Sequence, residues 1–336
     1  MPGAPLPVWT ASFARAYLVT MRPYLLFVSG AAALAGLSFC ADQSPRRTLA
    51  AFAALFLSYG LGQALTDCFQ TDTDSLSAPY RPLVAGAVSR RQVLAVSMTG
   101  LVLVVAVLAL LDPRILVPGA AAVAGLLTYT FFKRRWWGGP PWNSWIVALI
   151  PLMGRLTDSA WSPAAFAGAP GTEGAALGLA VLAVFFGYAN FVVMGYFKDI
   201  SADRATGYRT LPVVFGWRAA AVCGDVLAVL AVAPAAAAVA MAAPGASSPL
   251  APDGVSVPAL AALAAAVAVY VVAQAAMHRT RDERATGTPI ANGVRALVLL
   301  CLAVALSNRP GWWGALAVFY ALFELALRLR PERGQV

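Results

Sequence analysis

Oxygen-bearing side chains gather in two short stretches of an otherwise apolar chain. Five of the fifteen acidic residues lie in these stretches, at positions 66–86 and 198–216. Asp199 and Asp203 are four residues apart, as are Gln70 and Asp74, and in a helix this spacing places both members of a pair on one face. Rows of oxygens at one-turn intervals suit a hard cation such as Mg²⁺. The sequence therefore predicts a site for two or more Mg²⁺ ions, with ligands drawn from Asp67, Gln70, Asp72, Asp74, Asp199 and Asp203.

Basic side chains accompany both acidic stretches. Carboxylates repel a diphosphate, so they can hold one only through bridging cations, and basic neighbours can neutralise the charge of the departing group. The predicted diphosphate-binding residues are Arg81, Lys133, Arg134, Lys198, Arg204 and Arg209. Loop charges beside a membrane are often only solvated caps. Two rows of matched spacing with bases beside them favour instead a site that breaks a carbon–oxygen bond to diphosphate.

Long apolar helices must position these residues. A hydrocarbon core about 30 Å thick needs ~20 mostly apolar residues in a helix. Ten such runs occur, at about 24–41, 50–66, 93–111, 115–132, 144–160, 174–196, 218–242, 255–277, 290–306 and 312–329. Hydrophobic residues make up 60% of the chain and charged residues 12%, so it lacks the polar surface of a soluble globule. We predict an all-α integral membrane protein with a single domain over residues 1–336.

The distribution of lysine and arginine predicts the orientation of this domain. Of the 24 basic residues, Arg155 and Arg295 lie inside predicted helices. Eighteen of the other 22 fall in the termini and in alternate loops, and the intervening loops hold only Arg46, Arg47, Arg114 and Arg309. Basic residues are enriched on the cytoplasmic side of membrane proteins. Both acidic stretches belong to the basic side, so we expect an active site that faces the cytoplasm of a multi-pass membrane protein.

The two acidic stretches share an order of features that indicates a duplication. Each begins at the end of an apolar helix with spaced acids, and each continues into an arginine followed by leucine and proline, at 81–84 and 209–213. The repeat distance is about 130 residues. Pseudo-symmetric halves of this kind are common in membrane proteins. We therefore expect the two acidic motifs to face each other across a helix bundle.

These motifs resemble the UbiA superfamily of intramembrane prenyltransferases. The second motif, Lys198-Asp199-x-x-x-Asp203-Arg204 followed by Gly207-x-Arg209-Thr210-Leu211-Pro212-Val213, is the most specific match. The first, with Asp67, Asp74, Pro79-Tyr80-Arg81-Pro82-Leu83 and Gly86, resembles the chlorophyll-synthase-like branch, and Tyr129-x-x-x-Lys133-Arg134 resembles a diphosphate-binding segment. The resemblance covers about residues 20–305. It implies nine helices around a central cavity, so residues 306–336 would add a tenth helix and a tail.

The resemblance implies an Mg²⁺-dependent enzyme that ionises a polyprenyl diphosphate and transfers the prenyl group to an acceptor. The acceptor would be an aromatic ring, a quinone precursor or an alcohol, the bilayer would hold the isoprenoid tail, and no nucleic acid is expected. Aromatic faces stabilise an allylic cation. The expected catalytic residues are Asp67, Asp74, Asp199, Asp203, Tyr129 and Tyr196.

One departure from the family pattern keeps a second reaction open. Thr66 and Gln70 stand where the family usually has Asn and Asp, which removes one negative charge from the first motif. A terpene cyclase of the UbiA type, which turns a linear C15–C25 diphosphate into a cyclic product, is therefore the alternative. An ion-coupled transporter is a more remote one, because acids in broken helices also bind ions in carriers.

Overall fold

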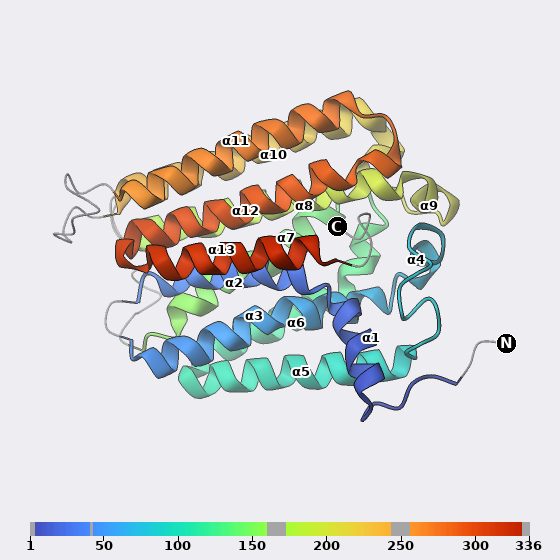
Figure 1. Ribbon diagram of the computed structural model, residues 1–336, viewed down its shortest axis with the longest axis horizontal. Coiled ribbons are helices and arrows are strands. Elements are labelled where there is room, and N and C mark those ends of the chain that lie inside the picture. The colour runs from blue at the N-terminus through green and yellow to red at the C-terminus, as the bar shows by residue number, and fades with distance from the viewer. Residues whose placement is uncertain (1–3, 41–42, 160–172, 243–255, 331–336) are drawn as a thin grey trace.

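Helices run side by side along the longest axis of the molecule (Figure 1). The computed structural model describes residues 4–40, 43–159, 173–242 and 256–330, and every regular element in these ranges is a helix. Among the described residues, eight helices are long and apolar enough to cross a membrane, or up to nine if the bent pair formed by α1 (Ala11–Met21) and the helical segment Pro23–Leu37 makes one span. The predicted all-α membrane fold is confirmed.

Each of the ten predicted apolar runs coincides with a helix. They are α2 (Leu26–Leu37), α3 (Pro45–Asp67), α5 (Arg90–Leu111), α6 (Leu116–Lys133), α7 (Gly139–Leu156), α8 (Glu173–Tyr196), α10 (Leu211–Met241), α11 (Val257–Arg279), α12 (Gly287–Asn308) and α13 (Trp313–Arg328). α7 is not among the eight apolar spans, because Asn143, Ser144 and Arg155 lower its hydropathy. Positions 41, 160, 255 and 331–336, which the predicted runs and tail include, lie outside the described residues.

Helices α2, α7, α8 and α12 pack against one another in the middle of the bundle. α2 contacts α7, α8 and α12, and α8 contacts α7 and α12. Glycines permit the close crossing of α2 and α7, since a Cβ atom at Gly36 would overlap the carbonyl oxygen of Pro151. Small residues are the usual means of close helix packing in lipid.

Both acidic motifs lie at one end of the bundle, and in each motif one residue departs from helical geometry. α4 (Thr71–Ser77) follows α3, and α9 (Ile200–Ala205) follows α8, both at the right-hand end of Figure 1. Gln70 (φ −124°, ψ 17°) precedes α4, and Asp199 (φ −113°, ψ 9°) precedes α9. The first member of each four-residue pair is therefore the residue just before the short helix, and the second member lies inside that helix. The predicted repeat is visible in these two short helices, each preceded by one non-helical residue.

The two motifs also end alike. Gly86 (φ 76°) closes the first and Gly216 (φ 79°) closes the second. A positive φ of this size is the left-handed conformation that glycine adopts without steric cost. Both positions therefore favour glycine over a residue with a side chain.

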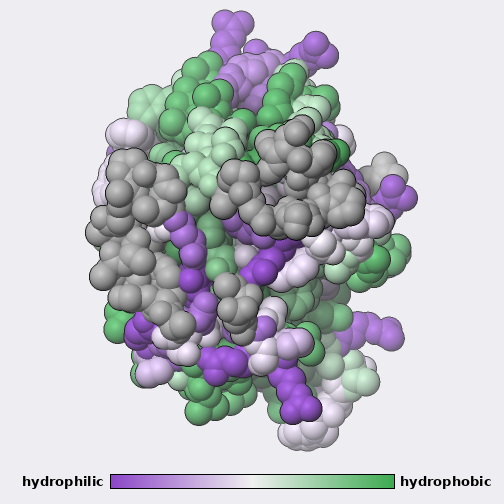
Figure 2. Space-filling model, turned by 90° about the vertical axis from the view of Figure 1, so that its left-hand side faces the viewer, coloured by the Kyte–Doolittle hydropathy of each residue, from purple (hydrophilic) through white to green (hydrophobic). Residues whose placement is uncertain are grey.

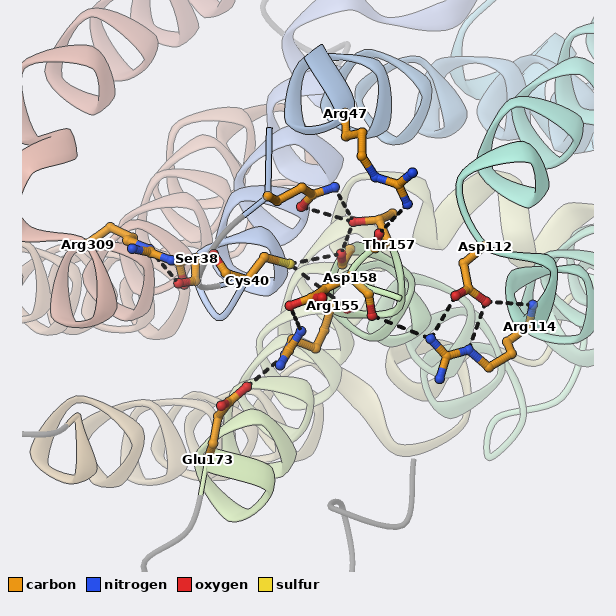
Figure 3. A network of polar contacts seen from close by, with 12 residues as sticks. Ser38, Cys40, Arg47, Asp112, Arg114, Arg155, Thr157, Asp158, Glu173 and Arg309 are labelled. Carbon is orange, nitrogen blue, oxygen red and sulfur yellow. Dashed lines mark hydrogen bonds and ion pairs between the residues drawn. The ribbon is translucent and has the colours of Figure 1, made fainter. Parts of the chain in front are cut away.

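Arginines tie together the opposite end of the bundle (Figure 3). Arg47 donates to the carbonyl oxygens of Leu111 at 2.8 Å and Thr157 at 3.0 Å, and Arg309 donates to those of Ser38 and Cys40. These carbonyls belong to the C-terminal ends of helices α5, α7 and α2, which attract cations. Hydrophilic residues stand out on this end in Figure 2. Arg47 and Arg309, two of the four arginines in the predicted loops with few basic residues, thus cap helix ends.

Candidate active site

A polar cavity lies where the two motifs meet. Its lining combines groups from the N-terminal segment, both motifs, α6 and α8: Arg22, Leu25, Tyr59, Gln63, Asp67, Gln70, Asp74, Arg81, Tyr129, Lys133, Tyr188, Phe191, Val192, Gly195, Tyr196 and Asp199. Thr73 of α4 and Thr206, just after α9, are hydrogen-bonded through their hydroxyl oxygens at 2.9 Å. We expected both motifs to face one cavity. Eight of the predicted site residues line this one, namely Asp67, Gln70, Asp74, Arg81, Tyr129, Lys133, Tyr196 and Asp199.

Arg22 and Arg81 each pair with a buried acid of the first motif. Nη2 of Arg22 lies 3.0 Å from each carboxylate oxygen of Asp67, and the Gln63 amide donates to the same carboxylate at 2.7 Å. Nη1 of Arg81 lies 2.5 Å from Oδ2 of Asp74. All four charged side chains are at most 10% exposed. Buried pairs of this kind are strongly coupled, because removing one partner leaves an uncompensated charge.

Arg81 remains a cation in this setting. Burial acts to lower the pKa of its guanidinium, but the attraction of Asp74, Asp67 and Asp199 outweighs burial and raises the pKa above its ordinary value. Its Nε atom is buried and has no hydrogen-bond partner. Arg81 can therefore offer a charged donor to an anion in the cavity.

Gln70 and Lys133 join the first motif to α6. Nζ of Lys133 donates to Oε1 of Gln70 at 2.6 Å, and the same ammonium lies 6.0 Å from the ring centroid of Tyr196. Lys133 is only 7% exposed. Gln70 is neutral, so it holds the ammonium through a hydrogen bond without adding a negative charge.

The two acids of the second motif differ in position. Asp199 lines the polar cavity. Asp203 is not part of that lining and is fully buried, and its Oδ2 accepts a hydrogen bond from Oγ1 of Thr210 at 2.9 Å. Its Oδ1 is buried without a partner. A buried carboxylate oxygen with no donor is costly unless a further group satisfies it.

Asp72 and Arg134 form a surface contact outside the cavity. Nη2 of Arg134 lies 2.8 Å from Oδ2 of Asp72, and their side chains are 49% and 40% exposed. The hydroxyl of Tyr208 donates to the other Asp72 oxygen at 3.1 Å, and the Arg134 guanidinium lies over the Tyr208 ring. Burial raises the pKa of the Tyr208 hydroxyl, so this group remains a donor. The three side chains link α4, α6 and the segment after α9.

Besides Arg134, three of the predicted diphosphate-binding residues do not line the polar cavity. Arg204 and Arg209 are exposed. Lys198 lines a neighbouring pocket instead. The backbone nitrogen of Arg209 donates to the carbonyl oxygen of Arg134 at 3.1 Å, which fixes the path of the chain between the second motif and α6.

An apolar cavity adjoins the polar one. It is lined mainly by α3, α5, α6 and α7, through residues such as Leu55, Leu101, Leu108, Ala122, Ile146 and Met153. Tyr59, Gln63 and Tyr188 line both cavities. The hydroxyls of Tyr59 and Tyr188 are 2.7 Å apart, and Asn143 donates to the latter at 3.3 Å. The two spaces therefore place charged side chains beside an apolar lining.

No three Asp, Glu, His or Cys side chains of the described ranges are already grouped to hold a metal ion. The acids of the first motif are instead paired with arginines. The donor set nevertheless suits Mg²⁺, because carboxylate and amide oxygens from both motifs surround one cavity and Oδ1 of Asp203 lacks a partner.

Several residues of the site lack a signal in the sequence. Arg22 reads there as one of many basic residues near the membrane surface, and Gln63 and Tyr59 read as parts of an apolar helix. Only their one-turn spacing before Asp67, at positions 59, 63 and 67, places them on one face of α3. That spacing continues the first motif one and two turns toward the N-terminus.

Comparison with known proteins gives the family. The sequence model described as the UbiA prenyltransferase family matches residues 24–287. The chain belongs to that family. It is a UbiA-type prenyltransferase, which confirms the prediction of an enzyme. It is similar to the digeranylgeranylglyceryl phosphate synthase of Halobacterium salinarum, with 34% identity over 63% of this chain and 73% of that protein. The synthase of the same name from Natronomonas pharaonis is 33% identical over 62% of this chain and 73% of that one.

Solved structures of UbiA homologs share the fold. A homolog from Aeropyrum pernix K1 superposes with a TM-score of 0.64 at 22% identity, over 81% of this chain and 94% of that one. A homolog from Archaeoglobus fulgidus, bound to GPP and Mg²⁺, gives a TM-score of 0.61 at 18% identity over 86% and 99% of the two chains. At these identities the likeness supports the architecture alone.

Proposed function

We propose that this UbiA-family enzyme uses Mg²⁺ to ionise a prenyl diphosphate and transfers the prenyl group to an alcohol acceptor. The observation that carries the proposal is the junction of the two cavities at Tyr59, Gln63 and Tyr188. A diphosphate among the charged groups would leave its prenyl chain in the apolar space. The carbon–oxygen bond between the diphosphate and the prenyl chain would then lie beside the aromatic rings of Tyr59 and Tyr188.

The metal ligands in this proposal come from both motifs. They are Asp67, Gln70, Asp74, Asp199 and Asp203, whose oxygens suit two or more Mg²⁺ ions. Bound Mg²⁺ would neutralise the phosphate oxygens and make diphosphate a better leaving group. Asp72 is a weaker candidate, since it contacts Arg134 and Tyr208 at the surface.

The chain's own residues would bind and orient the substrate. Arg81 and Lys133 are buried cations that line the cavity, so they would stabilise the negative charge on the leaving diphosphate. Tyr129 and Tyr196 line the same cavity, and their ring faces would stabilise positive charge on the prenyl carbon. The acceptor hydroxyl would lose its proton as its oxygen bonds to that carbon and the diphosphate leaves.

The names of the similar relatives support an alcohol acceptor. They are synthases of digeranylgeranylglyceryl phosphate, and GPP and Mg²⁺ are bound by a structural neighbour. We propose by this likeness that the acceptor carries a glyceryl phosphate head. The surplus of basic residues at the end that holds both motifs supports a cavity that opens to the cytoplasm.

Incubation of the purified enzyme with Mg²⁺ and C10–C25 prenyl diphosphates tests the proposal. Transfer predicts that diphosphate is released only when a glyceryl phosphate acceptor is added, with a prenylated product detected by mass spectrometry. A cyclic hydrocarbon formed without acceptor would identify a terpene cyclase instead. Intact substrate with every acceptor would count against both reactions.

A further inference from the structure

A second polar pocket lies beside the active site at the same end of the bundle. It measures about 690 Å³ and is lined by Leu76, Ser77, Lys198, Ser201, Ala202, Arg281, Asp282, Glu283, Arg284, Thr286 and Gly287. These residues belong to α4, to the segment around α9 and to the short helix η5 (Glu283–Ala285) before α12. The Proposed function assigns no role to this pocket.

This pocket and the polar cavity are lined by adjacent residues of the same segments. Asp199 lines the cavity, and its neighbour Lys198 lines the pocket. On α4, Asp74 lines the cavity and Ser77, almost one turn later, lines the pocket. The same two motif segments therefore contribute side chains to both spaces.

The charges in the pocket favour an anion. Its acids make local contacts: Asp282 accepts from the backbone nitrogen of Arg284 at 2.9 Å, and Glu283 accepts from the hydroxyl of Ser201 at 2.6 Å. Across the described residues, by contrast, neither the Arg281 nor the Arg284 side chain makes an ion pair or hydrogen bond. Lys198 also lines the pocket, so three basic and two acidic side chains contribute to it.

An unsatisfied hydroxyl also lines the pocket. Oγ of Ser77 is buried and has no hydrogen-bond partner. A hydroxyl can donate to a phosphate oxygen, and guanidinium groups bind phosphates through two parallel hydrogen bonds. Both features suit the same class of ligand.

We propose that this pocket is a phosphate-binding subsite of the enzyme, formed by Arg281, Arg284, Lys198 and Ser77. The inference rests on the proposed function, because two phosphates of that reaction could reach it. One is the phosphate head of the acceptor, and the other is the diphosphate released from the neighbouring cavity. The shared chemistry is a tetrahedral phosphate bound by arginines at the aqueous end of the bundle.

The test compares two double variants that lose the same charge. Arg281→Gln with Arg284→Gln removes the two free guanidinium groups of the pocket. Arg279→Gln with Arg328→Gln is the matched control, since both arginines are exposed at the ends of α11 and α13 and neither lines the pocket. Both variants are assayed for the KM of prenyl diphosphate, the KM of acceptor and the inhibition constant of inorganic pyrophosphate.

We expect the pocket variant to raise either the KM of acceptor or the inhibition constant of inorganic pyrophosphate at least fivefold relative to the control. Its KM of prenyl diphosphate should stay within twofold of the control. A raised acceptor KM identifies the acceptor head as the ligand, and a raised pyrophosphate constant identifies the leaving group. Equal constants in the two variants would overturn the subsite. If the wild-type enzyme transfers no prenyl group, calorimetric titration with inorganic pyrophosphate still tests the pocket, and equal affinity in both variants would again refute it.

Discussion

Arg22 and Asp67 form a buried ion pair in which one guanidinium nitrogen lies 3.0 Å from both carboxylate oxygens. The pair joins the break between α1 and α2 to the end of α3. Arg22 itself adopts the left-handed conformation (φ 52°), which is uncommon for a residue other than glycine. The arginine thus supplies the positive charge beside a carboxylate that we propose as a metal ligand.

Substitution of Arg22 by Gln should make the stability of the protein depend more strongly on Mg²⁺. Loss of one partner from a buried ion pair costs about 3–5 kcal/mol, because the remaining charge has no counter-ion. Mg²⁺ at Asp67 would replace that charge, so the melting temperature should fall markedly in EDTA and less in Mg²⁺. Thermal unfolding in detergent under both conditions measures the difference.

Arg295→Gln provides the control for the Arg22 variant. Arg295 pairs with Glu324 at 2.7 Å within the membrane helices, far along the chain from either motif. Its substitution should lower the melting temperature equally with and without Mg²⁺. An Arg22 variant that behaves in the same way would show that Asp67 does not bind the metal.

Substitution of single acids by Asn should lower kcat much more for acids that line the cavity than for an acid outside it. Asp74→Asn and Asp199→Asn should each reduce kcat by about 100- to 1000-fold, the usual cost of a lost transition-state contact. Asp72→Asn should reduce it less than fivefold, because exposed ion pairs contribute only about 0–1 kcal/mol. Turnover in the membrane fraction, normalised to expression, gives the comparison.

Asp225→Asn serves as the matched control for these acids. Asp225 is an intramembrane acid of α10 that contacts His278 at 2.7 Å and does not line the polar cavity. The Asp225→Asn enzyme should keep most of the wild-type activity. Equal losses at Asp225 and Asp199 would indicate a general effect of intramembrane acids on folding, and full activity at Asp199 would exclude the metal site.

The sequence places the acids in two motifs but does not show which of them reach the cavity. The spacing of Asp199 and Asp203 is the same as that of Gln70 and Asp74. Yet Asp199 lines the cavity, whereas Asp203 is fully buried and is not part of the lining. Local spacing cannot reveal this difference, because it depends on the packing of segments far apart in the chain, as the contact of Thr73 with Thr206 shows.

Helix positions followed from hydropathy, whereas burial did not. The apolar windows of α11 and of the span that contains α12 have nearly equal mean hydropathy, 2.1 and 2.0, yet 28% of the first and 78% of the second are buried inside the protein. Lipid and protein interior are similarly apolar, so composition does not distinguish them. Which helices surround the cavities therefore had to come from the three-dimensional structure.

Enlargement of Ala122 should alter the preference for prenyl chain length. Ala122 lines the apolar cavity on α6, and Ala124 on the same helix is exposed. A Phe ring at position 122 should occupy space that we assign to the distal isoprene units. The ratio of kcat/KM for C20 over C10 diphosphate should fall at least about tenfold, in the range expected for lost apolar contacts.

Ala124→Phe is the control for chain length, because it adds the same ring to the outer side of α6. Its C20-to-C10 ratio should stay within twofold of the wild type. Should Ala122→Phe leave the ratio unchanged as well, the prenyl chain must lie elsewhere than in this cavity. Product analysis by mass spectrometry with both substrates in competition gives the ratio directly.

The crossing of α2 and α7 should be intolerant of a single methyl group. A Cβ at Gly36 would overlap the backbone of Pro151, which cannot move aside as a flexible side chain can. Gly36→Ala should therefore lower the free energy of unfolding by about 1–3 kcal/mol, as overpacking of a core does. Gly314→Ala in α13 meets no atom within 4 Å and should leave stability unchanged or slightly raised, since Ala favours helix. Both are measured as melting temperatures in the same detergent.

Because α7 carries Asn143 beside Tyr188 at the junction of the cavities, the Gly36 variant should also lose prenyl transfer. A stable Gly36→Ala enzyme with normal turnover would mean that α2 and α7 do not cross this closely.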